Sequence, residues 1–370
     1  MSELKGSHIG QNGELENACV TIDSLNCSDL LSLLTLMSHH RSKDVKVESV
    51  VGGNRFNQPS KVSQRDFHKI EGHIFDQLPE VEFIELSVLQ PFGINTVLAD
   101  TNEKNVVAAL RRSEVNADAT TALFRVALQR FRTQKPIQSS TIRLASNSRI
   151  TRAQVFDPAT KFLPHFKVFG EVTVGRQSEK FGEEELLTLI GHLKSELQII
   201  NVLDKDTSFS IADYGVSISN VLLMQGLMDR GVVSQDELRR NTANPNYDAF
   251  VAAGLNIPPE LPFDTPEIGR VLRSYGFERG VKVTEVFQAL VAENVPELMP
   301  ILMLDLRRIA GIGYYRHLCY HITAQNEQGE VLPIGDGGST DWMEKVTGRK
   351  DLYCVSSGIG TELLGQYFIR

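Results

Sequence analysis

The stretch from Met303 to Leu364 places the strongest constraint on how this chain of 370 residues can fold. It holds three segments rich in residue types that strands favour, separated by polar or glycine-rich turns. Asn326–Gly329 forms the first turn, and a last strand over Leu352–Ser357 runs into two glycines and a final helix. A glycine-bearing junction of strand and helix offers free backbone N–H groups to a polar or anionic ligand. An ordinary meander whose glycines only serve turns fits the spacing equally well.

The remainder of the chain alternates predicted strands and helices. Its periodicity predicts strands over Lys43–Val51, Val81–Leu89, Thr141–Phe156, His165–Val174 and Thr207–Ala212. It predicts helices over Ser28–Met37, Ser63–Leu78, Glu103–Arg112, Thr121–Phe131, Glu183–Leu197 and Ser217–Met228, and a largely helical insertion over Val232–Met299. Runs of strands with helices gathered between them favour an α+β fold, with an antiparallel sheet flanked by helices. No GxGxxG follows a strand and no GxxxxGK[ST] is present, which argues against a doubly wound nucleotide-binding fold.

The bulk composition excludes several classes of protein. A formal net charge of −8 argues against a generally basic nucleic-acid-binding surface. The four cysteines lack CxxC spacing and are typical of reduced thiols, and the nine histidines lack HExxH spacing, so no metal site is predicted. The N-terminus does not resemble a signal peptide, and no apolar run is long enough to span a bilayer. These features predict a cytoplasmic protein without a membrane partner.

Several segments, in order along the chain, resemble a known family. Asn116-Ala-Asp118-Ala-Thr120, with Arg125 after it, is similar to the "RADIT…AR" segment of the regulatory subunit of ATP phosphoribosyltransferase. Further similarities are Arg152-Ala-Gln154 to the second class II motif, Gly311–Tyr315 to "RGLDYY", Gly337–Asp341 to "GGRYD" and Gly358–Leu363 to the third motif. The chain therefore resembles the catalytic core of class II aminoacyl-tRNA synthetases in the histidyl branch, and most of all that regulatory paralog.

This resemblance implies a division of the chain. Residues 1–62 form a poorly matched N-terminal extension. Residues 63–230 and 300–370 form the synthetase-like core, and residues 231–299 form the helical insertion. The chain ends directly after the third motif, so we expect no anticodon-binding domain, and a tRNA substrate is not expected. The helix and strand of residues 63–89 match the layout of the first motif, which implies a homodimer.

The resemblance also assigns residues to a site. It implies an amino-acid pocket formed by Asp118, Thr120, Gln154, Tyr314, Tyr315, Gly337, Gly338 and Asp341. Asp118 stands where synthetases carry a glutamate that holds the substrate amino group. Nucleotide binding is assigned to Arg152, Gly358, Gly360 and Glu362, with ATP and Mg²⁺ as the implied cofactors. Arg152 matches the α-phosphate arginine of the second motif and is the catalytic candidate.

Two arginines of the synthetase pattern are replaced here, by Ala310 and Leu363. Fixed cations stabilise the charge that develops on phosphates, so their loss weakens the case for adenylation. The first hypothesis is a regulatory or accessory subunit that binds a small, histidine-like amino acid and acts on a partner enzyme. The second is a tRNA-independent ligase that activates an amino acid with ATP, releasing AMP. A third is a degenerate scaffold that keeps only the dimer. Arg149, Arg308 and Arg316 are the candidates to replace the missing cations.

Overall fold

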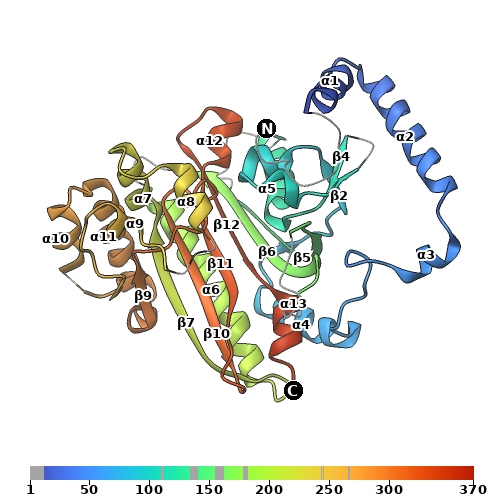
Figure 1. The fold of residues 1–370 in the computed structure, drawn as a ribbon. Helices are drawn as coiled ribbons and strands as arrows, with labels where there is room; N and C mark the ends of the chain where they lie inside the picture. The colour runs from blue at the N-terminus through green and yellow to red at the C-terminus, as the bar shows by residue number, and fades with distance from the viewer. Residues whose placement is uncertain are drawn as a thin grey trace.

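A large twisted sheet organises the protein, as the ribbon of the computed structural model shows (Figure 1). The structure describes residues 12–109, 112–133, 141–154, 162–177, 182–242, 244, 246–265 and 267–370. In these residues the main sheet has nine strands in the order β1-β5-β6-β12-β11-β10-β7-β9-β8. Its strands are β1 (Glu82–Phe83), β5 (Ile142–Thr151), β6 (His165–Arg176), β7 (Ile211–Asn220), β8 (Glu260–Pro262), β9 (Leu302–Asp305), β10 (Leu318–Asn326), β11 (Val331–Thr340) and β12 (Leu352–Ile359).

The six central strands, from β5 to β7, are antiparallel throughout. The sheet becomes parallel only toward its edges, where β1 pairs with β5 and β9 pairs with β7. A second, small sheet contains β2 (Leu89–Pro91), β3 (Ala108–Ala109) and β4 (Ser113–Val115). The predicted α+β class with a largely antiparallel sheet flanked by helices is therefore confirmed.

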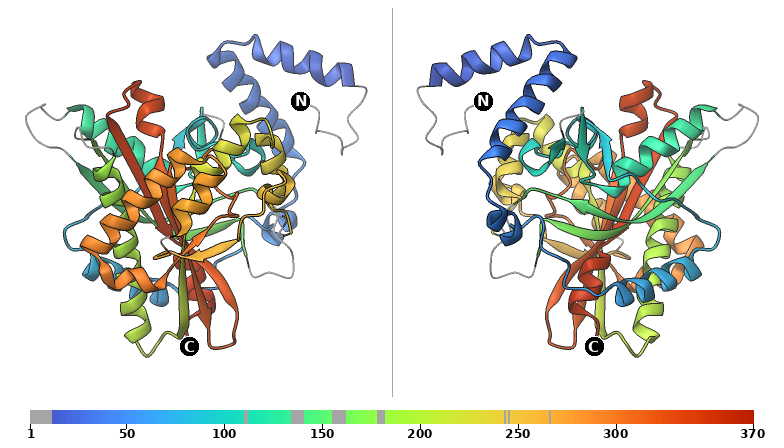
Figure 2. Two further views of the ribbon diagram at one scale, coloured as in Figure 1. Left: turned by 90° about the vertical axis from the view of Figure 1, so that its left-hand side faces the viewer. Right: turned by 90° about the vertical axis from the view of Figure 1, so that its right-hand side faces the viewer.

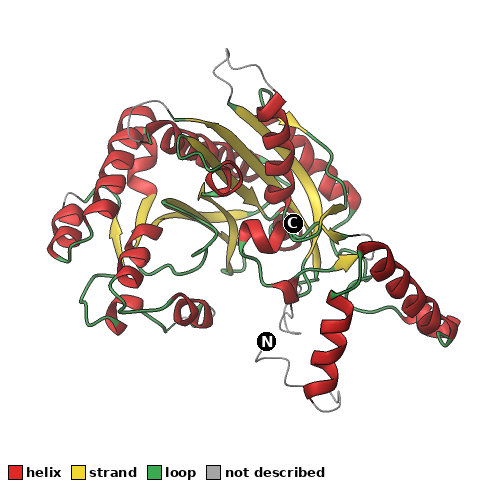
Figure 3. Cartoon of the chain, turned by 90° about the horizontal axis from the view of Figure 1, so that it is seen from above, coloured by secondary structure: helices red, strands yellow, loops and turns green. Residues whose placement is uncertain are grey.

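Helices cover both faces of the main sheet. They are α1 (Asn12–Asp23), α2 (Cys27–Lys43), α3 (Val47–Gly52), α4 (Gln64–Gln77), α5 (Ala119–Thr133), α6 (Glu183–Lys205), α7 (Val221–Asp229), α8 (Gln235–Asn241), α9 (Ala249–Ala252), α10 (Glu267–Ser274), α11 (Glu278–Asn294), α12 (Trp342–Thr347) and α13 (Thr361–Tyr367). Shorter turns are η1 (Ile94–Leu98), η2 (Glu103–Asn105) and η3 (Pro296–Ile301). In Figure 3, seen from above, helices lie on either side of the sheet.

Two clusters of buried apolar side chains hold the main sheet and its helices together. Because side chains alternate along a strand, neighbouring residues of β6 serve opposite faces. Phe169 packs into the cluster of α4 and α6, whereas α5 lies over Gly170 on the other face. On α4, Ser63 caps the helix by accepting the Asp66 N–H, and Phe67, Ile70 and Ile74 are buried at helical spacing.

The N-terminal segment projects from the body as an arm of three helices, α1 to α3 (Figure 2). No residue of α2 is buried. Asn26 caps α2, and the helix continues beyond the predicted end at Met37 to Lys43. The strand predicted over Lys43–Val51 is wrong, because the segment meets no sheet edge to pair with and forms α3 instead.

Other sequence predictions need correction. Residues 103–109 form η2 and β3 instead of a helix, since they close the small sheet against β4. The strand predicted over Thr207–Ala212 runs from Ile211 to Asn220, so the following helix starts later, at Val221. The region predicted as helical insertion also contributes a short strand, β8, which extends the sheet by pairing with β9. No helix in the described residues combines the length and apolar character needed to cross a bilayer.

Candidate functional site

A cavity of about 320 Å³ opens on the α5 face of the sheet. Its walls come from β5, β6, β11 and β12, the first turn of α5 and the loop before β10. The lining residues are Thr101, Asn105, Asp118, Ala119, Thr120, Ile150, Arg152, Gln154, Val168, Phe169, Gly170, Gly311, Tyr314, Tyr315, Asp336, Ser356, Ser357, Gly358, Ile359 and Gly360. Six of the residues expected to bind an amino acid or a phosphate therefore meet in one cavity with the two glycines of the third motif.

Asp118 is held at one end of this cavity, just before α5. Its Oδ1 accepts hydrogen bonds from the Thr120 N–H at 2.8 Å and the Thr120 hydroxyl at 2.6 Å. Its Oδ2 accepts the Tyr314 hydroxyl at 3.2 Å and lies 3.7 Å from Nη2 of Arg152. One carboxylate oxygen thus satisfies a free backbone N–H at the start of α5. The other oxygen, together with Arg152, faces the cavity.

A second carboxylate, Asp336 on β11, lies in the same cavity. Its Oδ1 accepts the Tyr315 hydroxyl at 2.9 Å, and its Oδ2 pairs with Nη2 of Arg308 at 3.0 Å. Arg308 also donates to the carbonyls of Ala310 and Tyr320, and its side chain is only 10% exposed. The guanidinium therefore supports Asp336 without lining the cavity itself.

The two adjacent phenols stay protonated and act as donors. Burial, followed by the charge of Asp118, raises the pKa of Tyr314 well above its ordinary value. Burial and the charge of Asp336 do the same to the pKa of Tyr315. Burial opposes the charge of Arg308, but the carboxylate of Asp336 beside it outweighs this effect and raises the pKa of the guanidinium. The neutral phenols therefore donate hydrogen bonds to both carboxylates, and the cation Arg308 also donates to Asp336.

Arg152 is the one positively charged side chain among the described residues that line the cavity. Arg149 projects from the opposite face of β5, where it pairs with Glu362 at 3.2 Å and packs against Phe67 of α4. Arg316 pairs with Glu344 of α12 at 2.8 Å, also outside the cavity. Neither arginine stands in for the cations replaced by Ala310 and Leu363.

Glu362 lies away from the cavity lining, although the sequence assigned it to a nucleotide. It accepts hydrogen bonds from the Ser60 hydroxyl and, at 3.1 Å, from the Lys167 N–H, in addition to its pair with Arg149. Its carboxylate is thus occupied by Lys167, by Arg149 and by Ser60, which belongs to the strap of residues 53–62 that joins the arm to the body. It borders a second hollow of about 330 Å³ next to the cavity.

The glycine pair of β11 serves packing instead of lining the cavity. A Cβ on Gly338 would lie 2.5 Å from Cδ1 of Tyr315, and one on Gly337 would lie 2.5 Å from Cζ of Tyr320. Both glycines therefore make room for aromatic rings, and Gly338 lets Tyr315 lie flat on the strand. Asp341 also lies outside the cavity, where it starts α12 and pairs with Lys345 at 3.0 Å.

The second hollow shares Arg152, Gln154 and Gly360 with the cavity. Its other walls are mostly apolar, from Phe162, Leu163, Phe166, Pro333 and Leu363, with Glu362 and Gln366 at the edge. An apolar slot beside a cation suits a planar base. No cluster of three or more His, Cys, Asp or Glu side chains suited to a metal ion occurs in the described part of the chain.

Sequence reasoning missed Asp336 and the role of Arg308. The available signal was the alternation of side chains along a strand. Asp336 and Gly338 are two residues apart and therefore lie on the same face of the sheet, which is the face that Tyr315 packs against. Arg308 was named only as a substitute for a phosphate-binding arginine, and its pairing with Asp336 joins segments 28 residues apart.

No family model and no curated protein matches the chain in sequence. Solved structures match its fold. An ATP phosphoribosyltransferase regulatory subunit/histidyl-tRNA synthetase from Bacillus halodurans superimposes with a TM-score of 0.60 at 15% identity, over 85% of this chain and 82% of that one. Histidyl-tRNA synthetase from Nostoc sp. PCC 7120 gives 0.60 at 13% identity, over 86% and 76%. The apo enzyme from S. aureus gives 0.53 at 13% identity, over 84% and 72%. The chain thus has the class II synthetase-like fold that the histidyl branch and a regulatory paralog share.

Proposed function

We propose that this protein is a cytoplasmic, homodimeric regulatory or accessory subunit that binds a small amino acid and acts on a partner enzyme. The observation that carries the proposal is the charge arrangement of the cavity. Asp118 and Arg152 present opposite charges 3.7 Å apart, which matches the α-ammonium and α-carboxylate of an amino acid. The similarity in fold to a structure named as a regulatory subunit supports the same assignment.

The shortage of cations weighs against ordinary adenylation. Losing a single charge-stabilising donor typically lowers a rate by roughly 10²–10³-fold. Ala310 and Leu363 provide no such donor, and Arg149, Arg308 and Arg316 are engaged elsewhere. This shortage of cations and the net charge of −8 both argue against a tRNA substrate.

The second candidate is a tRNA-independent, AMP-forming amino-acid ligase. The apolar hollow beside Arg152 favours it, because ATP could place its base there with its phosphates toward Arg152. ATP chemistry would also require Mg²⁺, which ATP phosphates bring with them. Glu362 is a poor ligand for that ion, since Ser60, Lys167 and Arg149 already occupy its carboxylate.

Two measurements separate these functions. Calorimetry with the free amino acids should detect binding to the purified chain, and Asp118→Asn should abolish it. Amino-acid-dependent exchange of pyrophosphate into ATP should stay at background. Exchange that is lost in Arg152→Ala but kept in Arg176→Ala, an exposed arginine at the end of β6, would establish the ligase instead. If none of the free amino acids binds to the purified chain, both functions are refuted.

A further inference from the structure

The second carboxylate of the cavity stands in a straight row across the sheet. In the strand register, Gly170 of β6 pairs with Gly358 of β12, and Gly358 pairs with Asp336 of β11. Asp336 is therefore two strands away from Gly170, which corresponds to about 10 Å. The two glycines in this row carry no side chain, so the floor of the cavity stays open along it.

Asp118 lies at the opposite end of the row. The residues directly after it stand over Gly170: a Cβ at Gly170 would lie 3.0 Å from Cβ of Ala119 and 3.5 Å from Cγ2 of Thr120. Both carboxylates line the same cavity, and the adjacent phenols of Tyr314 and Tyr315, whose ring centroids are 4.8 Å apart, connect them. The cavity thus has an acidic group at each end of a glycine floor.

Asp336 is held ready to accept a further hydrogen bond. Tyr315 and Arg308 each donate one hydrogen bond to its two oxygens, and a carboxylate can accept about four. Its side chain remains 45% exposed, whereas Arg308 behind it is 10% exposed. Arg308 lowers the net charge at this end but is not among the residues that line the cavity. A ligand therefore meets the carboxylate and not the guanidinium.

We propose that Asp336 selects the side chain of the bound amino acid, and that the ligand is an amino acid with a second, cationic nitrogen, such as a diamino or guanidino acid. This inference rests on the proposed amino-acid binding at Asp118 and Arg152. The α-ammonium binds Asp118, the α-carboxylate binds Arg152, and the distal cation binds Asp336.

The placement of the two carboxylates fits this class of ligand. They stand at opposite ends of the glycine floor, so a ligand that pairs with both needs an aliphatic chain between its two nitrogens. The flat floor of Gly170 and Gly358 and the phenol rings suit the methylenes of such a chain. A neutral side chain of equal length would leave Asp336 without a ligand partner.

Calorimetry on the full chain tests the inference with matched pairs of ligands. Lysine is compared with norleucine, and arginine with citrulline, because each pair differs mainly in the distal charge. The cationic member should bind at least tenfold more tightly, and raising the salt concentration should reduce the difference. In Asp336→Asn the two members of each pair should bind alike. Asp351→Asn is the control, since that carboxylate is also paired with an arginine and 46% exposed but lies outside the cavity.

The outcomes are distinct. Equal binding of cationic and neutral members by the wild-type chain overturns the inference and leaves the proposed function intact, even if Asp336→Asn fails to fold. The inference is also overturned if Asp336→Asn weakens both members equally. If no amino acid binds at all, the proposed function fails and the inference fails with it.

Discussion

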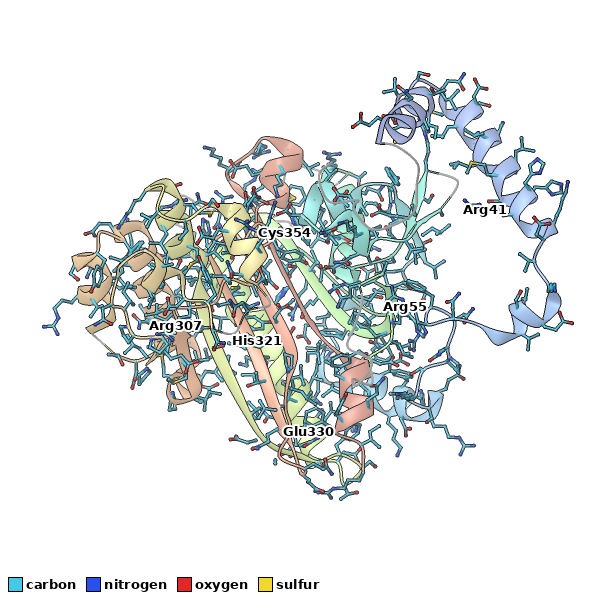
Figure 4. All side chains as sticks on the ribbon, in the orientation of Figure 1. Arg41, Arg55, Arg307, His321, Glu330 and Cys354 are labelled. Atoms are coloured by element: carbon cyan, nitrogen blue, oxygen red, sulfur yellow. The ribbon has the colours of Figure 1, made fainter. Side chains whose placement is uncertain are left out.

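Arg55, at the root of the N-terminal arm, donates a 2.7 Å hydrogen bond from Nη1 to the carbonyl of Gln154 at the rim of the cavity. Its Nη2 donates to the neighbouring carbonyl of Ala153, also at 2.7 Å. Figure 4 shows Arg55 where the arm meets the body, and Arg41 far out on the arm. A segment that none of the motif similarities covers therefore holds the backbone directly after Arg152.

The first prediction concerns this contact. Arg55→Ala should loosen the rim and weaken amino-acid binding about threefold to tenfold, since only part of the about 1.5–3 kcal/mol that hydrogen bonds from a charged donor contribute is passed on to the ligand. Arg41→Ala, which removes an arginine of the arm outside this contact, should leave binding unchanged. Calorimetry measures the affinity, and limited proteolysis should cut the strap of residues 53–62 faster in the first variant only. Equal behaviour of both variants would contradict the role of Arg55.

A second prediction concerns Gly338. An added methyl group would lie 2.5 Å from the ring of Tyr315 and 2.7 Å from Cβ of Cys319, so one of them must move. Gly338→Ala should cost about 1–3 kcal/mol of unfolding free energy, the usual range for overpacking, and should weaken ligand binding as Tyr315 leaves Asp336. Denaturant unfolding and calorimetry report the two effects.

Gly191 of α6 is the matched control, because an added Cβ there meets no atom within 4 Å. Gly191→Ala should raise stability by roughly 0.5–1 kcal/mol, the gain expected inside a helix. If Gly338→Ala proves as benign as this control, Tyr315 has more room than the structure shows.

The third prediction uses Glu196, a fully buried residue of α6 beneath β11. Burial, followed by the charges of Asp336 and Glu171, raises its pKa well above 4.5. The unfolded chain releases this proton near pH 4.5 while the folded chain keeps it, so stability falls as the pH rises above that value. Glu196→Met, of similar volume, should stabilise the fold, and the gain should be larger at pH 8 than at pH 4.5. Urea unfolding at both values checks the trend, and a gain independent of pH would be inconsistent with a protonated Glu196.

The fourth prediction concerns acid stability at Asp206, which ends α6. The Ser208 N–H, donating at 2.8 Å, and His73, at 2.7 Å, lower the pKa of Asp206 to about 2. Its stabilising effect is present above pH 3.8 and is lost as the pH falls through about 2. Asp206→Asn should cost about 1 kcal/mol at pH 7, after allowance for solvent screening, and little at pH 2. Exposed Asp204→Asn serves as control, and equal losses at both pH values would disprove the linkage.

The sequence predicted the parts of the fold that depend on local periodicity. α4, α5 and α6 follow from apolar residues at helical spacing, and β6 and β10 from runs of strand-favouring residues. The strand predicted at Lys43–Val51 failed because alternation needs a neighbouring strand to be realised. The helix predicted at Glu103–Arg112 failed because the small sheet competes for that segment.

For the site, the motif order predicted that Asp118, Arg152 and Tyr314 lie together, and all three line one cavity. The motif order could not show on which face of the sheet a charged side chain lies. Glu362 and Arg149 meet behind the sheet, and Asp336 faces the cavity. Those outcomes depend on pairing between segments far apart in sequence.

The glycine row beneath the cavity fixes the separation of the strands at its two ends. Main-chain hydrogen bonds set the spacing of β6, β12 and β11, so substitutions in the walls leave that separation unchanged. Sliding β11 by one residue would turn Asp336 to the α6 side, and sliding it by two would shift the carboxylate by about 7 Å along the strand. A change of register therefore alters the site abruptly, and finer adjustment falls to the length of the two acidic side chains.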